Sequence, residues 1–353
     1  MNAKTIGILV AMILAVVVTQ PARAKCSVET WKDCAGKPWV KGEMETPIGA
    51  RWWPSPLWGK GDEAGSTNWY TKPEVVKRAL AEADKGRVYT LGRPYDAKMP
   101  MFGGRSYELQ TRDPLHGVPA GGSATVYFEE MVTSQIGQVG TQFDGLGHIA
   151  VSEDGTSDPD KVRFYNGFTR AQVITAHGHR HLGVEKLHPI VARGVLIDIA
   201  GAKGVDMLEP GYAITREDVR AALIRQGMKD FAFKPGDAVF FYTGWSRLWD
   251  SDTKRFLAGE PGIGMEVADW LAKIKVGVVG SDNWGTEVVP PPDPECIFCI
   301  VHVNLILRHG IVNQEGLKLD ELVRDKVWTF LYMFTPVPLR GATGSPGAPI
   351  AID

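Results

Sequence analysis

The chain has 353 residues, a net charge of −2 and 44% hydrophobic residues, with its lysines and arginines dispersed. This balance excludes a polybasic surface for nucleic acid or anionic lipid, and the length permits a sizeable buried core. The sequence contains no linker-like stretch, internal repeat or low-complexity block, so we expect one folded domain.

The first 24 residues have the pattern of a secretory signal peptide. Lys4 precedes an unbroken apolar run over 6–18, and Ala22, Arg23 and Ala24 form a small-residue cleavage signal. The apolar run is short for a membrane span. We expect a signal peptide over 1–24 and an exported domain over 25–353, periplasmic or secreted, with no stable membrane insertion after cleavage.

The cysteine content fits an oxidising compartment. The four cysteines fall in two close pairs, Cys26 with Cys34 and Cys296 with Cys299. Three connectivities are possible, and pairing within each close pair is the simplest. The spacing of the second pair also fits a redox motif, but its proline-rich context favours a structural disulfide.

Turn-forming residues and apolar periodicity predict a mixture of elements. Residues 25–70 are rich in Trp, Gly and Pro and predict an ordered loop arm. Helical spacing or capping signals predict helices at 73–83, at 215–225 with Thr215 and Asp218 in a capping box, at 265–274 and at about 298–309. Apolar and β-branched runs predict strands at 87–91, 124–128, 137–144, 194–200, 238–243, 276–280 and 327–333. This succession indicates a mixed α/β protein with a mostly antiparallel or mixed sheet.

The most informative segment is residues 138–148, Gln-Val-Gly-Thr-Gln-Phe-Asp-Gly-Leu-Gly-His. If it is extended, Gln138, Gln142 and Asp144 project from one face, because strand side chains alternate between faces. The glycine between the two glutamines leaves space there. The two later glycines would bend the chain and bring His148 to the same place. The segment therefore predicts a binding site.

This segment resembles the signature of the cyclase family, H-x-G-T-H-x-D-x-P-x-H, a family that includes kynurenine formamidase and isatin hydrolase. Glutamines replace the two leading histidines, and Leu146 replaces the proline. The resulting form, Q-x-x-x-Q-x-D-x-x-x-H, is typical of the family's trans-dienelactone hydrolase branch. Further similar blocks follow in family order at 58–68, 100–105, 193–198, 236–245, 280–283 and 302–315. The resemblance implies a cyclase-like swivelling β/β/α fold with a mixed central sheet and flanking helices.

The resemblance also implies roles for single residues. Five would take the ligand positions of a metal site: Gln138, Gln142, Asp144, His302 and Glu315. His148 would be the acid/base group. An amide oxygen is a neutral, hard donor, so we expect one divalent ion, with Mn²⁺ favoured over Zn²⁺. Trp58, Phe102 and Trp284 are candidates to line the substrate pocket, with ordinary packing or a subunit interface as the alternative.

The expected function is metal-dependent hydrolysis of a small cyclic ester or amide, such as a dienelactone-like lactone or an isatin-like ring, by metal-activated water. One alternative is an arylformamidase acting on N-formyl aromatics, and another is a non-catalytic periplasmic ligand-binding protein of the same fold. No G-x-S-x-G motif supports a serine hydrolase. We expect His177, His179 and His181 to lie in a solvated loop. The expected partners are a small-molecule substrate and further copies of the chain, as a dimer or tetramer.

Overall fold

The computed structural model describes residues 52–114, 116–153, 158–292 and 300–353. The expected signal peptide, the first part of the expected loop arm and all four cysteines lie outside these residues. The cleavage site and the disulfides therefore stay predictions. Within the described ranges, no helix is both long enough and apolar enough to cross a bilayer.

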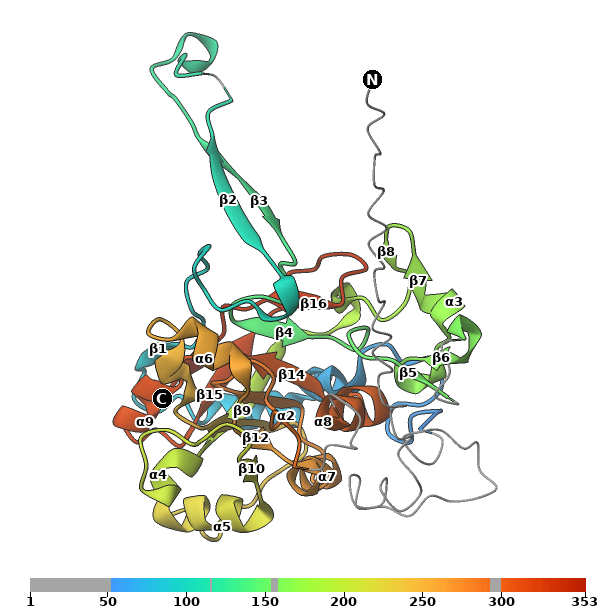
Figure 1. The fold of residues 1–353 in the computed structure, drawn as a ribbon, viewed down its shortest axis with the longest axis vertical. Helices are drawn as coiled ribbons and strands as arrows, with labels where there is room; N and C mark the ends of the chain where they lie inside the picture. The colour runs from blue at the N-terminus through green and yellow to red at the C-terminus, as the bar shows by residue number, and fades with distance from the viewer. Residues whose placement is uncertain (1–51, 115, 154–157, 293–299) are drawn as a thin grey trace, which may run out of the picture.

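A nine-stranded mixed sheet forms the centre of the molecule (Figure 1). Its middle strands are parallel to one another, and the strands on either side join in antiparallel fashion. From edge to edge the strands are β1 (Val88–Thr90), β17 (Ile350–Ile352), β15 (Thr329–Phe334), β9 (Ile190–Asp198), β11 (Ala238–Tyr242), β13 (Val278–Ser281), β14 (Val312–Glu315), β4 (Gln142–Asp144) and β16 (Gly344–Pro346). The mixed α/β prediction is confirmed.

Five of the α-helices, α4 to α8, lie in the connections between the parallel strands β9, β11, β13 and β14. The α-helices are α2 (Pro73–Leu80), α3 (Arg170–Val173), α4 (Ile199–Lys203), α5 (Arg216–Arg225), α6 (Thr253–Ala258), α7 (Met265–Lys273), α8 (Ile300–His302) and α9 (Asp320–Arg324). A π-helical turn, Val303–Arg308, continues α8. Short 3₁₀ turns cover Gly65–Thr71, Phe102–Gly104, Ala120–Gly122, Pro159–Lys161, Tyr165–Gly167, Val184–Lys186 and Trp245–Leu248. The predicted capping box is present, with Thr215 and Asp218 each accepting a hydrogen bond from the other's backbone N–H.

Both faces of the parallel strands are buried, which explains their continuous apolar runs. Leu196 and Phe240 pack on one face, and Ile197, Val239 and Phe241 pack on the other. Helices α5 and α7 and the segment 300–311 all cover the second face. The segment 300–311 connects β13 to β14. The two strands are parallel, so their carboxyl ends lie side by side at the same end of the sheet.

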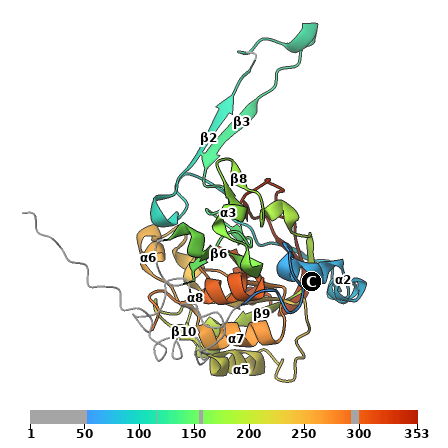
Figure 2. The ribbon, with the colours of Figure 1, turned by 90° about the vertical axis from the view of Figure 1, so that its right-hand side faces the viewer.

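Four two-stranded sheets complete the fold. They pair β10 (Ala213–Ile214) with β12 (Gly262–Ile263), β5 (Val151–Ser152) with β6 (Val162–Arg163), β7 (Ile174–Thr175) with β8 (Gly178–His179), and β2 (Tyr107–Arg112) with β3 (Glu129–Ser134). The β2–β3 hairpin projects from the body in both views (Figures 1 and 2). The strand predicted at 124–128 is wrong, because the hairpin strand begins only at Glu129.

The strand predicted over 137–144 is also shorter than expected. Strand β4 covers only Gln142–Asp144, and Gly140 has a φ of +68°. A Cβ at Gly140 would lie 2.7 Å from the Tyr95 ring. The glycine therefore permits a turn packed against Tyr95, rather than leaving space for a ligand.

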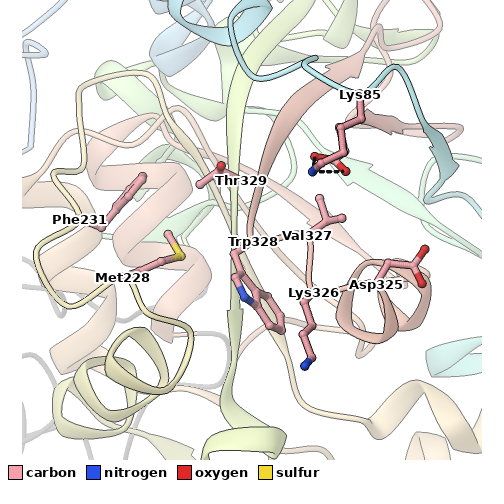
Figure 3. Close-up of a pocket in the computed structure, with 9 residues that line it drawn as sticks. Lys85, Met228, Phe231, Asp325, Lys326, Val327, Trp328 and Thr329 are labelled. Carbon is pink, nitrogen blue, oxygen red and sulfur yellow. Dashed lines mark hydrogen bonds and ion pairs between the residues drawn. The ribbon is translucent and has the colours of Figure 1, made fainter.

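A cavity of about 360 Å³ lies at the start of β15, away from β4 and β14 (Figure 3). Its lining residues are Lys85, Met228, Phe231, Asp325, Lys326, Val327, Trp328, Thr329 and Asp353. Three strands of the sheet separate β15, which contributes to this cavity, from β14. None of the predicted site residues lines it.

Candidate metal centre

The pairing of β4 with β14 brings the distant halves of the predicted site together. The two strands are antiparallel, with Asp144 opposite Asn313 and Gln142 opposite Glu315. Directly opposed residues project from the same face, and so do residues two apart on one strand. Four polar side chains therefore share one face, although more than 160 positions separate the two strands in sequence. All four are buried.

Asp144 is fully buried, and only one of its two carboxylate oxygens accepts a hydrogen bond. Gln138 Nε2 donates a 2.9 Å hydrogen bond to Asp144 Oδ1. Asp144 Oδ2 and Gln138 Oε1 have no hydrogen-bond partner. A buried carboxylate oxygen without a partner is costly, so both atoms point to a further group that the site is built to hold.

Glu315 is held from two sides by amides. Gln142 Nε2 donates to Glu315 Oε2 at 2.5 Å, and Asn313 Nδ2 donates to Glu315 Oε1 at 2.6 Å. Burial, followed by repulsion from Asp144, raises the pKa of Glu315 to about 7 against the lowering effect of His302 and Gln142. A cation at this place would offset both causes and favour the carboxylate.

His302 joins the two carboxylates through one ring nitrogen. Its Nε2 lies 3.0 Å from Glu315 Oε1 and 3.7 Å from Asp144 Oδ2. Its Nδ1 lies 3.2 Å from Glu287 Oε2, which also accepts the backbone N–H groups of Val301 and His302. A carboxylate that accepts from Nδ1–H leaves Nε2 as the basic atom, which is the arrangement that orients metal-binding histidines.

His148 reaches the edge of this cluster. Its Nε2 lies 3.9 Å from Asp144 Oδ1, and 20% of its side chain is exposed. Burial lowers the pKa of His148, and Asp144 opposes that effect only in part. The imidazole is therefore neutral near pH 7 and can accept a proton.

Two further buried glutamates lie at this centre, and sequence reasoning missed both. Glu287 is the partner of His302. Glu260 is fully buried, accepts the Trp284 N–H at 2.7 Å through Oε2, and leaves Oε1 without a partner. Burial, followed by repulsion from Glu315, raises the pKa of Glu260 well above its usual value. No sequence motif marks either residue, because only folding brings the segment after α6, which carries Glu260, beside the loop after β13, which carries Glu287.

The three aromatic residues predicted to line a pocket do not all come together. Phe102 and Trp284 stack, with ring centroids 4.4 Å apart and an interplanar angle of 13°. Through its backbone Trp284 also contacts Glu260, so this stacked pair borders the cluster. Trp58 instead packs edge-on against Trp69 at 5.0 Å. The structure thus pairs two of the three and places Trp58 in a different aromatic contact.

The donor set of the cluster fits a divalent ion. Asp144, His302 and Glu315 each offer one ligand atom, and these atoms lie within 4.8 Å of one another. Among the described residues this is the one such group of three, so the histidines at 177, 179 and 181 do not form another. Two carboxylates and one imidazole suit Mn²⁺ or Zn²⁺. A bound ion would also satisfy Asp144 Oδ2, which has no hydrogen-bond partner.

The two glutamines of the segment 138–148 each donate a hydrogen bond to a carboxylate. Each amide faces a carboxylate and therefore presents its N–H group to it. Gln142 holds Glu315, and Gln138 holds Asp144 while keeping its own oxygen available. Gln142 thus holds a candidate ligand through its N–H group, and its predicted role as a ligand stays a prediction.

Comparison with known proteins identifies the family of this chain. The Cyclase family profile matches residues 89–288, more than half of the chain, and the chain belongs to this family. A crystal structure described as a novel cyclase superposes with a TM-score of 0.73 at 28% identity, covering 84% of this chain and 96% of that one.

Two isatin hydrolases share the fold. Isatin hydrolase A from Ralstonia solanacearum has a TM-score of 0.52 at 20% identity and covers 80% of this chain and 98% of its own. The enzyme from Labrenzia aggregata, solved with benzyl benzoate, has a TM-score of 0.53 at 17% identity, with 78% and 98% covered. No curated protein matches the chain. The cyclase-like fold expected from the sequence is confirmed.

Proposed function

We propose that this protein is a metal-dependent hydrolase that opens a small cyclic ester or amide. The observation that carries the proposal is the buried group of Asp144, His302 and Glu315, whose ligand atoms converge while Asp144 Oδ2 lacks a hydrogen-bond partner. Membership of the Cyclase family supports it. So does the fold shared with proteins named isatin hydrolase, which makes a cyclic amide one candidate substrate.

Asp144, His302 and Glu315 would hold the ion, and Gln138 Oε1 is available as a further oxygen donor. A bound divalent ion supplies Lewis acidity, which lowers the pKa of water and polarises a carbonyl group. The oxygen-rich set leads us to favour one Mn²⁺ over Zn²⁺. Gln142 and Glu287 keep Glu315 and His302 in place through the hydrogen bonds described above.

His148 is the group we assign to proton transfer. Its partial exposure allows contact with a substrate at the cluster, and its lowered pKa keeps the accepting nitrogen unprotonated near neutral pH. It can take a proton from the attacking water and return it to the leaving oxygen or nitrogen. The stacked pair of Phe102 and Trp284 offers a flat apolar wall for a planar ring.

The form of the motif at 138–148 leads us to place the protein closest to the trans-dienelactone hydrolase branch, with a conjugated lactone as the preferred substrate. The signal at 1–24 leads us to propose that it acts after export, in the periplasm or outside the cell.

A substrate panel tests this function. The purified protein would be stripped with a chelator, reloaded with Mn²⁺ or Zn²⁺, and assayed against a dienelactone, isatin and an N-formyl aromatic amide. We expect chelator-sensitive turnover that Mn²⁺ restores, with the lactone or the cyclic amide preferred. Metal binding without turnover of any of the three would instead favour a ligand-binding role, and chelator-resistant turnover would contradict the metal mechanism.

A further inference from the structure

The loop from Asn283 to Glu287, at the carboxyl end of β13, has an uncommon backbone. The N–H of Glu287 donates to the carbonyl of Gly285 at 2.5 Å, and Thr286 between them has a φ of +60°. This is a γ-turn of the rare, strained kind. A β-branched residue in the left-handed region is a genuine outlier, and strain of this type persists where the surroundings enforce it.

The surroundings of the turn do enforce it. Asn283 donates through its side chain to the carbonyl of Pro261 at 2.5 Å and accepts the N–H of Thr286 at 2.7 Å. The carbonyl of Asn283 accepts the N–H of Gly316, the residue after β14. Thr286 itself is 1% exposed. The turn is therefore fixed between the end of β14 and the segment before α7.

The last residue of the turn contacts a candidate metal ligand directly, and the residue before it contacts a partner of another ligand. Glu287 accepts from His302. The Thr286 hydroxyl donates to Asn313 Oδ1 at 2.9 Å. The Glu315 carboxylate only accepts, so Asn313 Nδ2 must face it, and the Thr286 hydroxyl holds the oxygen end of the same amide in that orientation. With the amide reversed, an oxygen would lie against the Glu315 carboxylate, which is repulsive.

We propose that Thr286 and Asn313 are positioning residues, and that the strained turn at Thr286 sets the orientation of Glu315 and His302 together. The inference rests on the proposed metal site. Thr286 acts on Glu315 through Asn313, and the turn acts on His302 through Glu287. One local backbone conformation thus orients two ligands that come from different elements.

Four variants test this, with the Mn²⁺ dissociation constant measured by calorimetry and thermal unfolding followed by circular dichroism. T286V keeps the branched shape and loses the hydroxyl, and T286S keeps the hydroxyl. T286G removes the hydroxyl and also relieves the backbone strain, because glycine adopts a positive φ without a steric penalty. T67V is the matched control, because Thr67 is equally buried and its hydroxyl bonds only to backbone groups outside the site.

We expect T286V to weaken Mn²⁺ binding by about tenfold or more, the scale seen when residues that orient ligands are changed. T286S should retain wild-type affinity. T286G should lose affinity as T286V does, although its turn is relaxed, and T67V should lower only the unfolding temperature. Equal Mn²⁺ affinity in wild type, T286V and T286G would overturn the inference and leave the proposed function intact. Failure of the wild type to bind Mn²⁺ or Zn²⁺ would contradict both.

Discussion

Replacing Glu287 by glutamine isolates the contribution of one buried negative charge to the orientation of His302. Glu287 Oε2 accepts two backbone N–H groups and faces His302 Nδ1, at 2.8 to 3.2 Å. Hydrogen bonds to a charged acceptor contribute about 1.5–3 kcal/mol and neutral ones about 0.5–1.5 kcal/mol. All three contacts share one oxygen, so we expect a loss of about 2 kcal/mol in the free energy of unfolding. The metal should bind about tenfold more weakly, or about 1.4 kcal/mol.

Urea unfolding and Mn²⁺ calorimetry on E287Q measure the two effects separately. E217Q is the matched control, because Glu217 is exposed and pairs with Arg220 on the surface of α5. An exposed pair of this kind contributes little, so E217Q should change neither quantity measurably. A folded E287Q with wild-type Mn²⁺ affinity would refute the role assigned to Glu287.

Three further predictions concern the proton-transfer group, the aromatic wall and the fold. H148A should keep its metal and lose about 10²–10⁴-fold in kcat, and an unchanged rate would remove His148 from the mechanism. W284A should raise KM for a planar substrate more than it lowers kcat, which steady-state kinetics would show. D218A should cost about 1–2 kcal/mol in urea unfolding, since it breaks the capping box and the 2.5 Å ion pair with Lys203. Burial raises the pKa of Asp218, but the hydrogen bonds from Lys203 and Thr215 lower it by more, so the net pKa lies below its usual value. Its stabilisation is present above the unfolded pKa of about 3.9 and is lost as pH falls through the lower folded value, so wild type and D218A should converge in acid.

The buried parallel strands could be predicted from sequence, whereas the exposed hairpin could not. The runs that became β9 and β11 are apolar on both faces, and α5 and α7 on one side and α2 with loops on the other bury both faces. The β2–β3 hairpin is exposed along nearly its whole length. It has no buried face to impose alternation, so its second strand was placed several residues too early.

The candidate site was predictable where its residues are close in sequence. Asp144 and His148 lie in one segment, and the family resemblance supplied His302 and Glu315. Glu287 and Asn313 carry no motif, and they reach the cluster only because β13, β14 and β4 are neighbours in the sheet. The extended conformation assumed for Gln138 was wrong, yet Gln138 still reaches Asp144 across the turn at Gly140.

The most direct measurement is the metal content of the purified protein beside that of D144N and E315Q. Elemental analysis after dialysis against Mn²⁺ should give one ion per chain for the wild type. It should give little or none for either variant, because each removes one of two carboxylate ligands while its side chain keeps nearly the same shape. Full metal content in both folded variants, or none in the wild type, would contradict the account.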